Sequence, residues 1–214
     1  MSPEAAREVL EAAGAMNRAG LSPGTSGNVS RRVEDGFVVT PSGLAYDALG
    51  PDDMVALSLG GRVTAGRHKP SSEAPFHAAI YRARPEVGAI VHTHSPRATA
   101  LSCARVPIPA FHYMVAAAGG PDIPCAAYAT FGTDALADAA VRALAGRRAT
   151  LLANHGVIAL GATCSAALAL AAEVENLAGQ YLDLLASGLA PVILDAEEME
   201  RVLARFATYG QKAR

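Results

Sequence analysis

Apolar residues recur along the chain with two different spacings, which predict helices interleaved with short strands. Helical spacing predicts helices over 3–19, from 71 onward, and over 133–146, 164–187 and 195–209. Alternating or short continuous apolar runs predict strands at 29–32, 37–40, 54–59, 62–65, 88–94, 149–153 and 157–160. Hairpins mixed with helices favour an antiparallel or mixed sheet that is covered by helices on both faces.

Two of the predicted helices begin with recognisable chemical signals. Ser2 can cap the first helix, and Gly20 can end it. The helix after the second hairpin is expected to open at Ser71 and Ser72, with Pro75 in its first turn, where the missing backbone donor is not needed. The free backbone amides of such a start favour a bound anion.

The composition is that of a globular protein. The chain has 214 residues, 51% of them hydrophobic, and a formal net charge of -2, so we expect one domain over residues 1–214. No basic stripe indicates nucleic acid. The first helix lacks the basic start of a signal peptide, and the apolar stretch 166–172 is too short to span a membrane. Three cysteines without metal-like spacing favour a reduced, cytoplasmic protein.

The histidines give the sharpest local signal. His92 and His94 are two residues apart on a predicted strand, so their side chains face the same side. His155 lies between two short apolar strands, where a ligand is held rigidly. Three imidazoles and one oxygen suit Zn²⁺, although a short His-x-His pattern alone leaves a purely structural role open. The other histidines are interpreted as structural or supporting residues: His68, His77 and His112.

Three short polar segments could cradle a phosphate: 24–28, 40–43 and the pair Ser71-Ser72. Their glycines allow backbone amides to approach an anion, and their hydroxyls add donors, although ordinary turns and caps use the same residues. Glu73 would repel an anion there unless its carboxylate faces a cation, so it could ligate a metal or act as a base beside one. No nucleotide-binding motif is present in the sequence.

Five motifs combine these residues: Gly-Thr-Ser-Gly-Asn-Val-Ser at 24–30, Thr-Pro-Ser-Gly at 40–43, Pro-Ser-Ser-Glu at 70–73, His-Thr-His at 92–94 and Asn-His-Gly at 154–156. In order and spacing, over nearly the whole chain, the set resembles the class II aldolase/adducin family. Three further stretches resemble its L-fuculose-1-phosphate aldolase branch most closely: 111–114, 128–133 and 205–210.

The resemblance implies a three-layer α/β/α fold with a central mixed, largely antiparallel sheet. It also implies a homotetramer with active sites at the subunit interfaces. The implied cofactor is Zn²⁺, or another divalent transition metal such as Mn²⁺ or Co²⁺, held by His92, His94 and His155. Glu73 would be the fourth ligand at rest and the acid/base in turnover.

The resemblance also assigns the substrate-binding residues. Tyr113, from a neighbouring subunit, would stabilise or protonate the aldehyde oxygen. The residues implied to hold or shape the phosphate site are Thr25, Gly27, Asn28, Ser42, Gly43, Ser71 and Ser72. Those implied to line the aldehyde side are Phe131, Phe206 and Tyr209. Asn154 stands where L-fuculose-1-phosphate aldolase has a histidine, so the aldehyde itself is left open.

The implied activity is reversible cleavage of a ketose 1-phosphate to dihydroxyacetone phosphate and a small aldehyde. The candidate substrates are L-fuculose 1-phosphate, 5-deoxyribulose 1-phosphate and 5-methylthioribulose 1-phosphate. Three alternatives remain open at this point: a pentulose-phosphate 4-epimerase, a 5-methylthioribulose-1-phosphate dehydratase and a non-enzymatic adducin-like module. An epimerase releases no triose phosphate, a dehydratase releases water, and an adducin-like module needs no metal.

Overall fold

The computed structural model describes residues 1–206 and leaves residues 207–214 undescribed. An eight-stranded sheet forms its centre, in the order β4-β3-β2-β1-β5-β8-β7-β6. The strands are β1 (Asn28–Val33), β2 (Gly36–Val39), β3 (Val55–Ser58), β4 (Val63–Ala65), β5 (Ala89–Thr93), β6 (Cys125–Ala126), β7 (Ala149–Leu152) and β8 (Gly156–Gly161). Neighbouring strands run antiparallel except β6 and β7, which are parallel.

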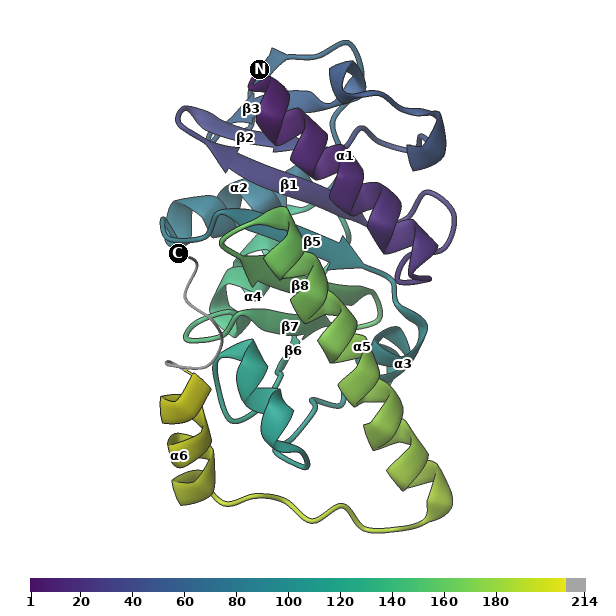
Figure 1. The fold of residues 1–214 in the computed structure, drawn as a ribbon, viewed down its shortest axis with the longest axis vertical. Helices are drawn as coiled ribbons and strands as arrows, with labels where there is room; N and C mark the ends of the chain where they lie inside the picture. Colours follow the sequence, from purple (N-terminus) through teal and green to yellow (C-terminus); the bar gives the residue numbers. More distant parts are fainter. Residues whose placement is uncertain (207–214) are drawn as a thin grey trace.

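Helices cover both faces of this sheet (Figure 1). One face carries α1 (Pro3–Arg18), α3 (Pro96–Ala104) and α5 (Cys164–Ser187). The other face carries α2 (Ala74–Ala83) and α4 (Asp134–Ala143). Two short 3₁₀ helices, η1 (Tyr46–Ala48) and η2 (Pro51–Asp53), lie between β2 and β3 along the chain.

Successive residues of the central strands enter two different cores. Ile90 of β5 packs in the core beneath α2 and α4, whereas Val91 packs in the core beneath α1, α3 and α5. Ile158 and Val157 of β8 divide in the same way. Because both faces are buried, β5 and β8 are nearly continuous apolar runs, not alternating ones. The predicted α/β/α layering with a largely antiparallel sheet is confirmed.

A sixth helix stands outside these layers. The helix α6 (Ala196–Phe206) packs against the 3₁₀ helix η3 (Tyr113–Ala118), and buried Met199 joins Ala110 and Ala116 in a small separate core. The segment between α5 and α6 exposes large apolar side chains, including Leu189, Val192 and Ile193.

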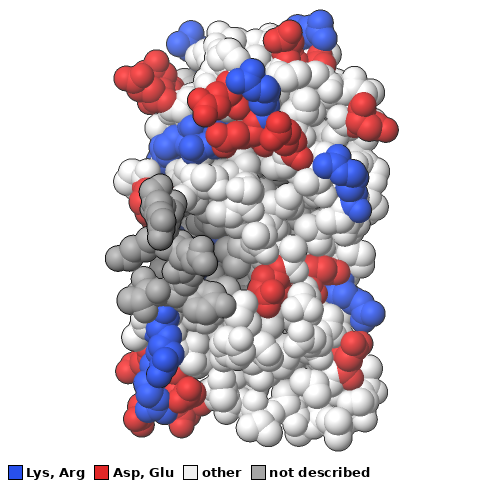
Figure 2. Space-filling model, in the orientation of Figure 1, with Lys and Arg blue, Asp and Glu red and all other residues white. Residues whose placement is uncertain are grey.

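Charged side chains of both signs are scattered over the face shown in Figure 2, and no stripe of one sign crosses it. That face lacks the basic band typical of nucleic-acid-binding proteins. Among residues 1–206, none of the helices combines the length and the hydropathy that crossing a bilayer requires.

Apart from the 3₁₀ helices, one α-helix and one strand of the structure are absent from the sequence prediction. The helix α3 has no strongly one-sided apolar pattern, and β6 is only two residues long, so neither leaves a clear periodic signal. The prediction for the start of α2 was also wrong. This helix begins at Ala74 with Glu73 as its cap, because the backbone of Ser71 is paired instead with Thr40.

The sheet brings its candidate chemistry to one place. β5 lies between β1 and β8, with Asn28 opposite His92 and Val157 opposite Thr93. Since these strands are antiparallel, the end of β5 lies beside the start of β1 and the start of β8. His94, which follows β5, therefore lies near the turn that joins β7 to β8.

Gly156 at the start of β8 is required by this close packing. A Cβ atom at this position would overlap the carbonyl oxygen of Thr93 and lie 3.0 Å from Cδ2 of His94. We expect Gly156→Ala to lower the free energy of unfolding by about 1–3 kcal/mol, the usual cost of overpacking. Urea denaturation measures this change.

Gly60→Ala is the matched control, because the nearest atom to its added Cβ is the Ser58 Oγ, at an ordinary 3.7 Å. Its free energy of unfolding should stay within about 0.5 kcal/mol of the parent. Equal stability of the Gly156 and Gly60 variants would contradict the packing argument.

Candidate metal centre

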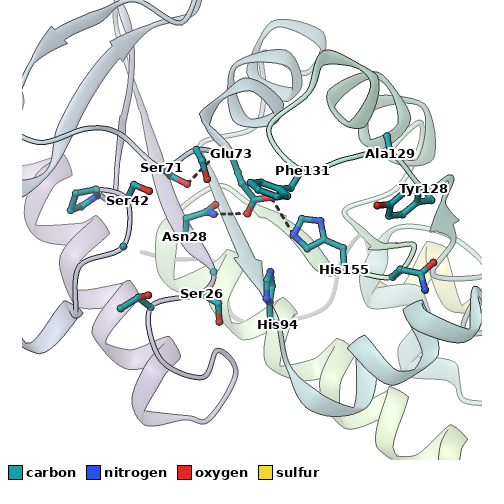
Figure 3. A pocket seen from close by; sticks show the side chains of 16 residues that line it. Ser26, Asn28, Ser42, Ser71, Glu73, His94, Tyr128, Ala129, Phe131 and His155 are labelled. Atoms are coloured by element: carbon teal, nitrogen blue, oxygen red, sulfur yellow. Dashed lines mark hydrogen bonds and ion pairs between the residues drawn. The ribbon is translucent and has the colours of Figure 1, made fainter.

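Four side chains converge where β5 ends in the middle of the sheet: Glu73, His92, His94 and His155. Their potential ligand atoms all lie within 4.8 Å of one another. Glu73 comes from the start of α2, His92 from β5, His94 from just after β5, and His155 from the turn before β8. Figure 3 shows Glu73, His94 and His155 in the middle of a cavity.

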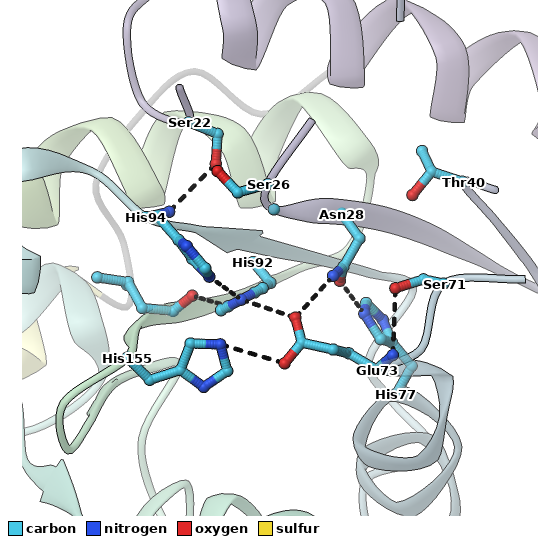
Figure 4. Close-up of polar contacts among 12 residues, drawn as sticks. Ser22, Ser26, Asn28, Thr40, Ser71, Glu73, His77, His92, His94 and His155 are labelled. Carbon is cyan, nitrogen blue, oxygen red and sulfur yellow. Dashed lines mark hydrogen bonds and ion pairs between the residues drawn. The ribbon is translucent and has the colours of Figure 1, made fainter. Parts of the chain in front are cut away.

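Short contacts tie the four side chains together (Figure 4). The Nε2 atoms of His92 and His94 are 3.0 Å apart. Glu73 Oε2 lies 3.0 Å from His92 Nε2, and Glu73 Oε1 lies 3.2 Å from His155 Nε2. All four groups thus present nitrogen or oxygen atoms to one common centre.

The four side chains are better suited to binding a cation between them than to contacting one another directly. His92 Nδ1 donates to the carbonyl oxygen of Val157 at 2.8 Å, so the Nε2 of a neutral His92 ring carries a lone pair. That lone pair faces a carboxylate oxygen of Glu73, and two such atoms repel unless positive charge lies between them. Although it lies 3.2 Å from His155 Nε2, Glu73 Oε1 is buried and has no hydrogen-bond partner among the described residues. Imidazole nitrogens and one carboxylate are the ligands that divalent transition metals such as zinc accept.

The electrostatics of the cluster favour an ionised carboxyl on Glu73 and a neutral imidazole on His94, the forms that bind a metal. Burial opposes ionisation of Glu73, but the imidazoles of His92 and His155, when they hold protons in place of a metal ion, act on it as positively charged donors. They outweigh burial and hold the pKa of this carboxyl well below its usual range. Burial, followed by the neighbouring His92 and His155, lowers the pKa of His94 to about 4. Glu73 is therefore ionised and His94 neutral near neutral pH, as metal ligands must be.

The helix α3, missing from the prediction, fixes the turn that carries His155. Asn154 has a left-handed backbone (φ 55°), which asparagine tolerates better than most residues. Its backbone N–H donates to the Ser102 carbonyl oxygen at 2.9 Å, and that of His155 donates to the Ser102 Oγ at 3.3 Å. Arg105 also has a left-handed backbone, and its Nε donates to the Asn154 Oδ1 at 3.1 Å. The end of α3 thus positions the third histidine.

The cluster opens into a cavity of about 340 Å³. On one side of the metal cluster the wall is made of hydroxyl, amide and glycine residues, and on the other side of Tyr128, Ala129 and Phe131 (Figure 3). The first wall contains every residue predicted to form the phosphate site: Thr25, Gly27, Asn28, Ser42, Gly43, Ser71 and Ser72. None of the described residues lining this cavity is Lys or Arg.

The remaining predicted residues are placed differently. Phe131 lines the cavity and is largely exposed. Tyr113 is 53% exposed on η3 and does not line the cavity of its own chain. Phe206, at the end of α6, packs against the small core around Met199, away from the cavity lining. Tyr209 lies outside the described residues.

Sequence reasoning overlooked three cavity residues, namely Tyr128, Ala129 and Asn154. The first two lie in a stretch that carried only a family resemblance, with no chemical signal of its own. Asn154 was noted as a departure, and its preference for left-handed backbone could have identified it as the turn residue.

The comparisons with known proteins agree with this geometry. The model of the class II aldolase and adducin N-terminal domain matches residues 7–182. The chain belongs to this family. A 5-methylthioribulose-1-phosphate/5-deoxyribulose-1-phosphate aldolase of Rhodospirillum rubrum is 53% identical over 205 residues, covering 96% of this chain and 92% of the relative.

Two further relatives belong to the fuculose branch of the family. An L-fuculose phosphate aldolase of Escherichia coli O6:H1 is 47% identical over 205 residues, covering 96% of this chain and 95% of the relative. A solved structure of an L-fuculose 1-phosphate aldolase superposes with a TM-score of 0.92 at 37% identity, covering 97% of this chain and 98% of that one. The relatives are named as aldolases, which are carbon–carbon lyases, and the expected family and fold are confirmed.

Removal of one ligand should abolish tight metal binding. We expect His94→Ala to lose the bound divalent ion on dialysis, because the remaining ligands no longer close around it. The variant should also lose the stabilisation that free metal gives the parent, about 2.7 kcal/mol at a hundredfold excess over Kd. Elemental analysis and thermal unfolding with and without metal measure both effects.

His68→Ala is the matched control, since His68 contacts Asp53 and lies outside the cluster. It should keep both the ion and the stabilisation. Full metal occupancy in the His94 variant would contradict the assignment of this ligand.

Proposed function

We propose that this protein is a class II aldolase that uses Zn²⁺ to cleave a ketose 1-phosphate reversibly into dihydroxyacetone phosphate and a small aldehyde. The observation that carries the proposal is the Glu73–His92–His94–His155 cluster, set between a polar and an aromatic wall of one cavity. Such a cavity suits a substrate with a phosphate at one end and an apolar tail at the other. The aldolase names of the relatives in both branches support the same reaction.

The polar wall would bind the phosphate half of the substrate. Gly27 and Gly43 have left-handed backbones that allow close approach of an anion. Ser42, Ser71 and Ser72 add hydroxyl groups. Because no basic side chain lines the described cavity, neutral donors and the metal would bind the phosphorylated substrate together, which fixes its orientation.

The metal ligands would be His92, His94 and His155, with Glu73 as a fourth ligand at rest. When bound, the divalent ion supplies Lewis-acid polarisation of the substrate carbonyl. In cleavage the hydroxyl on C4 would pass its proton through Tyr113 of the neighbouring subunit to water, and water would pass one proton to the Glu73 carboxylate. The C3–C4 bond breaks, and its electron pair stays on C3. Glu73 then delivers a proton to C3 to complete dihydroxyacetone phosphate, and it removes that proton in the synthetic direction.

The aldehyde side would be formed by Phe131 and by residues of the C-terminal segment and of a neighbouring subunit. We infer a homotetramer with sites at the subunit interfaces, in which Tyr113 of one subunit would stabilise or protonate the aldehyde oxygen in the next. Its exposure away from its own cavity supports this role. The exposed apolar side chains between α5 and α6 support an interface as well.

The substrate and its setting form the finest part of the proposal. We infer a cytoplasmic enzyme that acts on 5-methylthioribulose 1-phosphate or 5-deoxyribulose 1-phosphate, by-products of S-adenosylmethionine chemistry, and so serves methionine salvage. The name of the Rhodospirillum relative supports these sugars, and that of the Escherichia relative supports L-fuculose 1-phosphate. Phe206 and Tyr209 would complete the aldehyde pocket.

A coupled assay for dihydroxyacetone phosphate tests the function. The three sugar phosphates are each supplied to purified enzyme with Zn²⁺ and with a chelator. We expect triose phosphate release in the presence of Zn²⁺ and none in the presence of the chelator. The ranking of the three substrates by rate of release identifies the aldehyde. Absence of triose phosphate from a metal-loaded enzyme would refute aldol cleavage of these sugars and favour the epimerase or the dehydratase.

Glu73→Gln should reduce kcat by about 10²-fold or more, because it removes a general acid/base while keeping the shape of the side chain. Binding of dihydroxyacetone phosphate to the metal-loaded variant should persist. Glu34→Gln, in the exposed β1–β2 turn, is the matched control and should leave kcat unchanged. Near-parental kcat for Glu73→Gln would refute the acid/base role.

Subunit complementation tests the placement of Tyr113. When Glu73→Gln and Tyr113→Phe chains are co-expressed, an interfacial site can pair an intact Glu73 with an intact Tyr113 from its neighbour. Random mixing should then restore about a quarter of the parental activity, well above the sum of the two separate variants. Activity no greater than that sum would place both residues in one chain.

A further inference from the structure

Behind Glu73 lies a chain of buried polar side chains that continues away from the cavity. It consists of Asn28, His77, Ser30 and Tyr81, and we call it the Asn28–Tyr81 chain. The contacts are 3.0 Å from Asn28 Nδ2 to Glu73 Oε2, 2.5 Å from His77 Nε2 to Asn28 Oδ1, 2.7 Å from Ser30 Oγ to His77 Nδ1 and 2.8 Å from Ser30 Oγ to Tyr81 OH. Figure 4 shows the part nearest the metal centre.

The direction of every hydrogen bond in the Asn28–Tyr81 chain follows from the Glu73 carboxylate that Asn28 contacts. The ionised carboxylate of Glu73 can only accept, so Asn28 must present its amide nitrogen to Glu73 and its oxygen to His77. His77 Nε2 must then carry the proton, and Nδ1 of the neutral ring accepts from the hydroxyl of Ser30. The Ser30 oxygen in turn accepts from Tyr81. Asn28, His77 and Ser30 thus each donate one hydrogen bond to one neighbour and accept one from the other.

The imidazole of His77 is held rigidly and kept neutral. Its ring is fully buried and stacks on Phe76, with the ring centroids 4.6 Å apart and an interplanar angle of 20°. Burial lowers the pKa of His77 to about 3. A neutral imidazole in this setting has one stable tautomer, with the proton on Nε2.

The two oxygens of Glu73 consequently differ. Oε2 accepts a hydrogen bond from Asn28 and lies 3.0 Å from His92 Nε2, whereas Oε1 lies 3.2 Å from His155 Nε2, is buried and has no hydrogen-bond partner among residues 1–206. The Glu73 backbone N–H donates to the Ser71 Oγ at 3.2 Å, and this bond holds the backbone of Glu73 in place. The carboxylate is therefore held by an amide donor at Oε2, whereas Oε1 faces only the imidazole of His155.

We propose that His77 is a positioning residue, which acts through Asn28 to hold Oε2 of Glu73 and leaves Oε1 as the oxygen that exchanges the proton with substrate. This role rests on the proposed function of Glu73 as the acid/base. His77 does not line the cavity, so it has no direct contact with substrate. A merely structural buried histidine would affect stability alone, which separates the two roles experimentally.

Two substitutions of His77 distinguish these roles. The amide nitrogen of His77→Gln can still donate to Asn28 Oδ1, whereas His77→Leu cannot. We expect the leucine variant to lose about 10-fold or more in kcat with little change in KM, and the glutamine variant to recover most of that loss. Ile80→Ala, a fully buried site on the same helix, is the control for stability and should keep the parental kcat.

Metal affinity gives a second measurement that does not need activity. Because Glu73 is also a candidate ligand, His77→Leu should weaken Zn²⁺ binding by about 10-fold, the usual effect of losing a group that orients a ligand, and His77→Gln should weaken it less. Competition with a chromophoric chelator measures both. Equal kcat and Zn²⁺ affinity in the leucine and Ile80→Ala variants would overturn the proposal.

Nitrogen-15 NMR of the histidines in the unmodified, Zn²⁺-loaded protein tests the chain without any substitution. One buried ring should show the Nε2–H tautomer unchanged between about pH 6 and pH 8. A protonated Nδ1 on His77 would overturn the proposal. If the unmodified enzyme cleaves no sugar phosphate, the proposed function fails, and the tautomer and Zn²⁺ affinities still decide whether His77 positions Glu73.

Discussion

The site depends on the antiparallel pairing of β5 with β1 on one side and β8 on the other. This pairing places Asn28 beside His92 and the carbonyl oxygen of Val157 within reach of the His92 ring. It also brings the turn containing His155 to the end of β5. Glu73, the His92–His94 pair and His155 lie far apart in the sequence, and the pairing of β5 with its neighbours brings the histidines together. The hydrophobic cores on both faces of the sheet stabilise this pairing. The geometry of the centre is therefore a consequence of strand register.

The close approach of these four groups creates an electrostatic repulsion that a bound cation relieves. Three imidazoles and one carboxylate meet in a buried space, where unpaired lone pairs and a charge without a counterion are costly. A divalent cation removes that repulsion and at the same time creates a Lewis acid. The carboxylate of Glu73 is held from behind by Asn28 and from its backbone by Ser71, so the same group can serve the metal and the substrate in turn.

The sequence predicted most of the cluster and the polar wall from local signals: the His-x-His spacing, the glycine–hydroxyl loops and the acidic residue at a helix start. His155 carries only a weak signal by itself and was assigned through the family resemblance. The layered fold could be predicted too, since hairpins are mixed with helices along the chain and the family resemblance implies three layers. The helix α3 could not, because its apolar residues lack helical periodicity, and with it the support of His155 was missed.

Long-range pairing explains what else escaped the sequence. Ser71 was expected at the start of a helix, yet its backbone N–H donates to the carbonyl oxygen of Thr40, a partner that no local pattern predicts. The contacts of His77 likewise join α2 to β1, so the sequence could only suggest a supporting role. Tyr113 does not line the cavity of its own chain, and the role proposed for it would depend on a second copy.

Hydrogen exchange at dihydroxyacetone phosphate tests most directly whether Glu73 moves a proton at the metal centre. The metal-loaded enzyme is incubated with this product alone in deuterated water, and proton NMR follows the two hydrogens on the hydroxyl-bearing carbon. The account predicts that one of the two is replaced stereospecifically, and that Glu73→Gln or metal removal abolishes the exchange. Undiminished exchange by the Glu73 variant, or none by the metal-loaded parent, would contradict the account.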